Sequence, residues 1–91
     1  MTVSHARLSV NNTTAVPVTD NTDTYSSVTI SVQNLGEGVA YLGDAGVSDT
    51  SYGFSIVAGG AVTVANLPAK DELYVIHQDN SAYVSVMRVS R

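Results

Sequence analysis

The sequence predicts an all-β fold: a single antiparallel β-sandwich of about eight short strands, jelly-roll-like and without a long helix. Valine occurs 15 times in 91 residues, and threonine and serine are also frequent. Branched side chains of this kind pack well on a pleated sheet. Several stretches alternate apolar and polar residues, whereas no stretch sustains the 3.6-residue apolar period of a helix. Turn residues separate these stretches at the short intervals typical of sandwiches and small barrels.

The first four predicted strands are 5–10, 15–19, 26–34 and 39–43. The turn-forming stretches VNNTTA, TDNTDTYS and LGEG lie between them. The third strand carries the clearest alternation, because its apolar residues at every second position share one face: Val28, Ile30 and Val32.

The last four predicted strands are 54–57, 61–66, 72–78 and 82–90. They are separated by AGGA, LPAKD and QDNS, and the longer stretch AGVSDTSYG precedes the first of them. Two of these strands again place valines in phase: Val62 with Val64, and Val84 with Val86.

A chain of this length forms one domain, 1–91, with room for one modest core. The stretch DNTDTYSS at 20–27 is the most loop-like part of the sequence and could act as a hinge. Residues 1–25 would then form an N-terminal arm together with the first strands.

The composition excludes several classes of function. The formal net charge is −4, and the four basic residues form no run, so we expect no binding to nucleic acid or to an anionic membrane. The absence of cysteine excludes disulfides, thiolate catalysis and cysteine-based zinc sites. The N-terminal residues do not resemble a signal peptide and the apolar runs are too short to span a membrane, so we expect a soluble protein made in the cytoplasm.

The glycine-rich stretch NLGEGVAYLGDAGVS, residues 34–48, raises the question of a phosphate-binding loop. Gly36 and Gly38 form G-x-G, but Tyr41 stands where the dinucleotide-binding fingerprint has its third glycine, and a strand follows instead of a helix. The sequence therefore favours a hairpin turn at 35–38, in which glycine supplies a positive φ.

The acidic residues and histidines do not form a catalytic or metal-binding motif. Asp44 and Asp49 lie in a long loop, and His5 and His77 are far apart in sequence, with His77 expected on an edge or surface strand. A loose calcium site made by Asp20, Asn21 and Asp23 remains an alternative to ordinary turn residues. We expect no enzymatic activity, no cofactor and no catalytic residues.

The tyrosines offer candidate interaction anchors. Tyr41 and Tyr74 fall within predicted strands, and we expect them in or beside the core. Tyr25 and Tyr52 fall in loops, where an exposed ring gives a large contact area at a small entropic cost. The alternative is that these two rings only cover the open ends of the sandwich.

Residues 28–89 resemble the small head-decoration and related virion proteins of tailed bacteriophages. In that family a strand ending in Asn-x-Gly precedes a Val-Tyr-Leu-Gly strand, and a Ser/Thr-rich loop then leads to a Gly-aromatic-x-aliphatic step, an Ala-Gly turn and a late Leu-Tyr strand. The matching residues are 34–36, 39–43, 53–56, 58–59 and 73–74. Gly60 stands where the family often has an acidic residue.

The resemblance implies a structural virion protein that binds the outer surface of an assembled phage head and stabilises it. The partner would be the major capsid protein, the place of action the outer capsid surface of the virion, and the oligomer a homotrimer. An alternative is a fibre, tail or baseplate module that binds a partner protein or a host glycan through Tyr25 and Tyr52. A third class, a small glycan hydrolase, would need paired carboxylates such as Asp44 and Asp49 across a groove.

Overall fold

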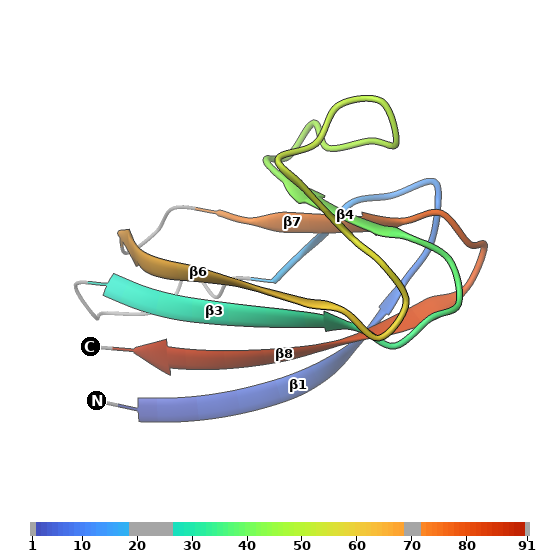
Figure 1. Ribbon diagram of the computed structural model, residues 1–91. Coiled ribbons are helices and arrows are strands. Elements are labelled where there is room, and N and C mark those ends of the chain that lie inside the picture. The colour runs from blue at the N-terminus through green and yellow to red at the C-terminus, as the bar shows by residue number, and fades with distance from the viewer. Residues whose placement is uncertain (1, 19–26, 69–71, 91) are drawn as a thin grey trace.

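A computed structural model describes residues 2–18, 27–68 and 72–90, and none of these residues lies in a helix. Eight strands account for most of the described chain (Figure 1). Their bounds are β1 Thr2–Val10, β2 Val16–Pro17, β3 Ser27–Asn34, β4 Ala40–Gly43, β5 Phe54–Ile56, β6 Ala61–Pro68, β7 Tyr74–His77 and β8 Ala82–Ser90. Among the described residues there is no helix that could cross a membrane.

The strands form two four-stranded antiparallel sheets, ordered β1-β8-β3-β6 and β2-β7-β4-β5. Four of the pairings join the first strand to the last, the second to the seventh, the third to the sixth and the fourth to the fifth. The chain is therefore one long hairpin of four strand pairs, rolled so that alternate pairs meet in the same sheet. This is the jelly-roll arrangement, and the predicted all-β sandwich is confirmed.

The core lies between the two sheets and follows from the alternation seen in the sequence. In β3 the side chains of Ile30 and Val32 are fully buried, while Ser31 and Gln33 face the outer side. The buried apolar cluster draws on six of the eight strands, together with one residue after β2: Val10, Val18, Ile30, Val32, Ala40, Leu42, Ile56, Val75, Ala82, Val84 and Val86.

A β-bulge keeps the apolar side chains of β6 directed toward this core along the whole strand. The pairing of β3 with β6 shifts between Val28 and Ile30, so that Leu67 pairs with Val28 and Val64 pairs with Ile30. Asn66, inside the bulge, has a φ of 56°. The extra residue turns Leu67 inward to pack against the core, a position that strict alternation would have given to Asn66.

The expected hairpin turn at 35–38 is wrong. The strands that it joins, β3 and β4, belong to different sheets, so the segment crosses from one layer of the sandwich to the other. Neither of its glycines has a positive φ. They are required by close approach instead: a Cβ on Gly36 would lie 2.7 Å from Nε2 of His77, and one on Gly38 would lie 2.5 Å from Oδ1 of Asp79.

Candidate binding surface

The loop between β4 and β5, residues 44–53, projects from the sandwich (Figure 1). Its first half is a turn in which Asp44 accepts two hydrogen bonds: Oδ1 from the N–H of Gly46 at 2.9 Å, and the carbonyl oxygen from the N–H of Val47 at 3.0 Å. Val47 is buried at the base of the loop and contacts Gly43 closely enough that a Cβ there would lie 3.2 Å from Cγ2 of Val47. This half is therefore anchored to the end of β4.

The second half of the loop is closed by a tight turn between Ser48 and Ser51. The N–H of Ser48 donates to the carbonyl of Ser51 at 2.8 Å, and the N–H of Ser51 donates back at 3.3 Å. The hydroxyl oxygen of Ser48 also accepts the N–H of Ser51 at 3.1 Å. Gly53 then returns the chain to the sheet by donating its N–H to the carbonyl of Leu42 at 2.8 Å. The loop is internally braced, so binding through it requires little ordering.

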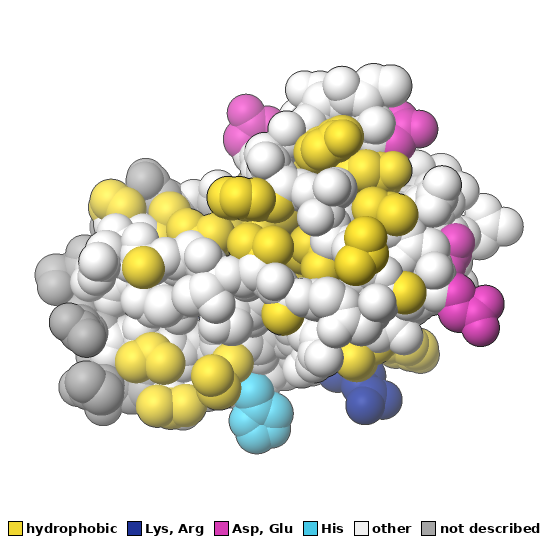
Figure 2. All heavy atoms as spheres, in the orientation of Figure 1, with side chains coloured by type: hydrophobic (Ala, Val, Ile, Leu, Met, Phe, Trp, Pro, Cys, Tyr) yellow, Lys and Arg dark blue, Asp and Glu magenta, His cyan; other side chains and the backbone are white. Residues whose placement is uncertain are grey.

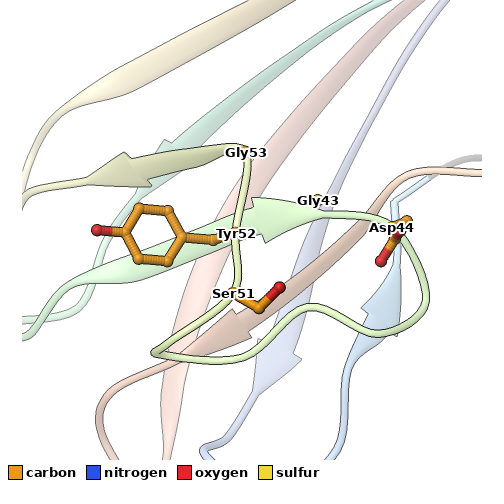
Figure 3. Close-up of a pocket in the computed structure, with 5 residues that line it drawn as sticks. All are labelled: Gly43, Asp44, Ser51, Tyr52 and Gly53. Carbon is orange, nitrogen blue, oxygen red and sulfur yellow. The ribbon is translucent and has the colours of Figure 1, made fainter.

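Tyr52, one of the two candidate interaction anchors, stands at the end of this loop with half of its surface exposed. Its ring packs against Tyr41 on β4, with the ring centroids 4.8 Å apart and the planes inclined by 39°. An open hollow of about 300 Å³ beside it is lined by Gly43, Asp44, Ser51, Tyr52 and Gly53. Figure 3 shows the Tyr52 ring projecting away from Asp44, so the aromatic and acidic side chains do not converge.

Two further apolar side chains are exposed on the edge strand β5 and directly after it. Phe54 is 52% exposed, and Val57, directly after the strand, is 65% exposed. Tyr52, Phe54 and Val57 are called the apolar strip below. Figure 2 shows hydrophobic side chains gathered beneath the projecting loop. Large apolar side chains that stay exposed on a small protein are candidates for an interaction surface.

Sequence reasoning missed Phe54 and Val57 because they belong to a predicted strand. Phe54 pairs with Leu42, so the two side chains share the inward face of the sheet. Leu42 is fully buried, whereas Phe54 lies on β5 at the margin of its sheet. Alternation reports which face a residue occupies, but it does not report whether the opposite sheet extends far enough to cover that residue.

A buried polar network joins the segment after β3 to the segment after β7. The side-chain amide of Asn34 donates to the carbonyls of Gly38 at 2.7 Å and Ile56 at 2.9 Å. Its Oδ1 accepts the N–H of Gly36 at 2.9 Å and lies 2.9 Å from Nε2 of His77. Asn34 is fully buried and every hydrogen-bonding atom of its side chain has a partner.

His77 is a buried member of this network, and its expected position on an edge or surface strand is wrong. It is 2% exposed and lies in β7, between β2 and β4. The N–H of Asp79 donates to Nδ1 at 2.9 Å, so Nε2 carries the proton and donates to Asn34. Burial lowers the pKa of His77, and the Asp79 carboxylate, 3.7 Å from Nδ1, opposes that shift only in part. The neutral imidazole thus links Asn34, at the end of β3, to Asp79, after β7, through one hydrogen bond at each ring nitrogen.

The other candidates from the sequence are not brought together. Asp44 lines the hollow beside Tyr52, whereas Asp49 lines a different hollow with Asn12 and Gln78. His5 is exposed on β1, whereas His77 is buried on β7, in the other sheet. Within the described ranges, no three His, Asp or Glu side chains are placed to hold a metal ion. Tyr25 and the loose calcium site at Asp20, Asn21 and Asp23 lie outside the described residues, as does the expected hinge except for Ser27.

The chain matches no protein-family model, and no curated protein matches it significantly.

Proposed function

We propose that this protein is a structural component of a phage virion that binds the outer surface of the assembled head and stabilises it. The observation that carries the proposal is the apolar strip on and beside a braced, projecting loop of a jelly roll. Such a surface fits contact with another protein, and the sequence resemblance to head-decoration proteins names the partner as the major capsid protein.

Stabilisation would follow from mass action. A protein that binds the assembled shell, and not its separated subunits, shifts the equilibrium toward the shell. If three copies associate as a homotrimer, their three apolar strips engage the capsid lattice together. The combined affinity is then much higher than the affinity of one strip alone. A trimer of the 9.5 kDa chain has a mass of about 28.5 kDa, which light scattering behind a sizing column measures directly.

The test uses heads that lack this protein, prepared from the phage that encodes it. Purified protein is added, and its co-sedimentation with heads and the temperature of head disruption are measured. We expect saturable binding and a higher disruption temperature. Phe54→Ser is expected to weaken binding by about tenfold or more, as for a central apolar contact. Met87→Ser is the matched control, because Met87 is similarly exposed but lies on the other sheet.

Failure of the wild-type protein to sediment with heads would overturn the proposal. Equal losses of head binding in Phe54→Ser and Met87→Ser would show that the apolar strip is not the contact surface. They would not contradict head binding itself. A monomeric mass both in solution and on the particle would overturn the homotrimer.

A second function, a tail, fibre or baseplate module that binds a host glycan, is favoured by one observation. The hollow beside Tyr52 is lined by the carboxylate of Asp44 and the hydroxyl of Ser51, which are hydrogen-bonding groups of the kind that orient a small polar ligand such as a sugar. Immunogold labelling of intact particles separates the two functions, because label on tails would support this one and label on heads the first. Asp44→Asn is then expected to reduce glycan binding and to leave head binding unchanged.

A further inference from the structure

The four sheet edges of this sandwich are not equally protected against pairing with another strand. β2 has two residues, one of which is Pro17, and β5 has three residues. β6 is longer, but it contains the bulge at Asn66 and ends at Pro68. Short length, proline and bulges are the features by which sheet proteins block their edges.

The fourth edge, β1, has none of these features. It runs for nine residues without proline or glycine, and all nine pair with β8 in an unbroken register from Thr2↔Ser90 to Val10↔Ala82. Every second residue of such a strand directs its N–H and C=O toward the free side. In the part of the chain that the structure describes, no strand occupies that side (Figure 1). β1 is therefore a long, regular and open edge.

The charge at this edge is positive on an otherwise acidic protein. Arg7 is exposed on the outer face of β1, with its guanidinium 5.9 Å from the centre of the Tyr83 ring, and His5 lies on the same face. The only other Lys or Arg among the described residues, Arg88, donates from Nε to the carbonyl of Val18 at 2.8 Å. The described acidic residues all lie outside the β1 sheet: Glu37, Asp44, Asp49, Glu72 and Asp79.

Figure 2 shows the same separation, with a histidine and a basic side chain at the lower margin, where β1 runs in Figure 1. Acidic side chains project from the loops at the top and right. A strand that joins β1 would therefore meet positive charge on its outer side. On its inner side it would meet Ala6 and Leu8, which are only half-buried.

We propose that β1 takes up an extended segment of a partner protein in which apolar and acidic residues alternate, adding a strand to the β1-β8-β3-β6 sheet. The backbone of the segment would pair with the open edge, its acidic side chains would face Arg7 and His5, and its apolar side chains would cover Leu8. A second copy of this chain fits less well. Its β1 carries the same basic residues and no acidic residue, so it would bring Arg7 to an edge that already carries Arg7. The apolar strip lies on the other sheet, so this inference does not depend on head binding.

The test uses the whole protein and a synthetic peptide, as long as β1, in which valine and glutamate alternate. Amide hydrogen exchange of residues 2–10 is followed as the peptide is added. We expect the exposed β1 amides to exchange at least about tenfold more slowly when the peptide is bound. The matched peptide, with lysine in place of glutamate, is expected to give no such protection.

A charge reversal tests the role of Arg7. Arg7→Glu is expected to weaken binding of the glutamate peptide by about fivefold and to improve binding of the lysine peptide, because cross-strand charge pairs change sign. Gln33→Glu is the control, since it adds a carboxylate to the outer face of the same sheet away from β1.

Three results would overturn the proposal. One is the absence of β1 protection at peptide concentrations up to about 1 mM, the range of weak strand addition. Another is protection that falls on a different segment, or that is equal for the two peptides. The third is protection of β1 that rises with protein concentration alone, which would identify a second copy as the occupant.

Discussion

At the scale of single residues, the side chain of Asn34 connects three parts of the chain that are distant in sequence. It bonds to the crossing segment at Gly36 and Gly38, to the end of β5 at Ile56, and to His77 on β7. An amide is suited to this position because it presents two donors and an acceptor from one small group. Neither an acid nor an aliphatic side chain of similar size could satisfy all of these partners.

Replacing Asn34 with alanine is expected to lower the free energy of unfolding by about 3 kcal/mol, because it leaves several buried donors and acceptors unpaired. Urea denaturation measures this change. Gln33→Ala is the control, since Gln33 is exposed on the outer face, and it is expected to stay within about 0.5 kcal/mol of the parent. Similar losses in the two variants would show that the network contributes nothing beyond the strand.

The lowered pKa of His77 makes stability depend on pH. The unfolded chain binds a proton at this residue below about pH 6.5, whereas the folded protein resists protonation until a lower pH. The free energy of unfolding is therefore expected to fall as the pH drops from about 6.5 toward 5, by up to about 1.4 kcal/mol per pH unit, and to be unaffected by this group at higher pH. Urea midpoints measured across this range test the expectation.

The control for this pH dependence compares two substitutions. His77→Gln removes the titrating group and is expected to flatten the slope between pH 5 and 6.5, even if it lowers stability overall. His5→Gln removes the exposed histidine of β1 and is expected to leave the slope in place. An unchanged slope in His77→Gln would assign the pH dependence to other groups.

Residue-level prediction from sequence failed where the reason for a residue lies in a distant segment. The sequence indicates that Gly36 and Gly38 belong to a turn, but the cause, the approach of His77 and Asp79, depends on a pairing between β4 and β7 that no local pattern reveals. The same holds for His77, which follows an apolar run and becomes buried only because Asn34 supplies a partner. The exposure of Tyr52 could be predicted because a loop position indicates exposure without knowledge of the partner strand.

At the scale of elements, the bulge in β6 shows how one extra residue keeps the apolar side chains at both ends of a strand directed toward the core. Without it, the last part of β6 would turn Leu67 toward solvent and Asn66 toward the core. Asparagine tolerates the left-handed backbone at this position better than most residues, and its N–H is within reach of the Thr29 hydroxyl at 3.4 Å.

Asn66→Val is expected to lower the free energy of unfolding by about 1–2 kcal/mol, because a β-branched residue is strained at a positive φ. Asn66→Gly is expected to be neutral within about 0.5 kcal/mol, since glycine adopts this conformation readily. Thermal or urea denaturation of both variants measures the difference. An Asn66→Val protein as stable as the Asn66→Gly protein would mean that the bulge relaxes to another register.

Every predicted strand is present, and the differences lie at the ends. β1 begins at residue 2, not 5, because its polar N-terminal residues gain backbone pairing with β8, which composition does not reveal. β6 continues past 66 because the bulge restores its phase after the alternation fails. The sequence therefore determines where strands form through side-chain alternation, while their exact length depends on which strand lies alongside.

At the scale of the whole molecule, the rolled hairpin joins segments that are far apart along the chain. β1 pairs with β8 over nine positions, from one end of the described chain to the other. Among the described strands, β4 and β5 are the only two that follow each other in the chain and also lie in the same sheet. The core therefore forms only when distant segments have met.

Refolding is expected to be slow for a chain of this size, on a time scale of milliseconds to seconds, because loop closure must precede most of the pairing. Stopped-flow dilution from urea, followed by tyrosine fluorescence and by far-UV circular dichroism, measures the rate. The two signals are expected to recover together. Recovery within microseconds would contradict the dependence of the fold on distant pairings.

The pairing of Thr2 with Ser90 brings the entry and the exit of the fold to neighbouring positions at one end of a sheet. Directly opposed residues of two antiparallel strands have Cα atoms about 5 Å apart. The whole sandwich could therefore be inserted into a surface loop of another protein without stretching either. Two different cargo segments, one joined ahead of Thr2 and the other beyond Ser90, would leave the sheet side by side from this end.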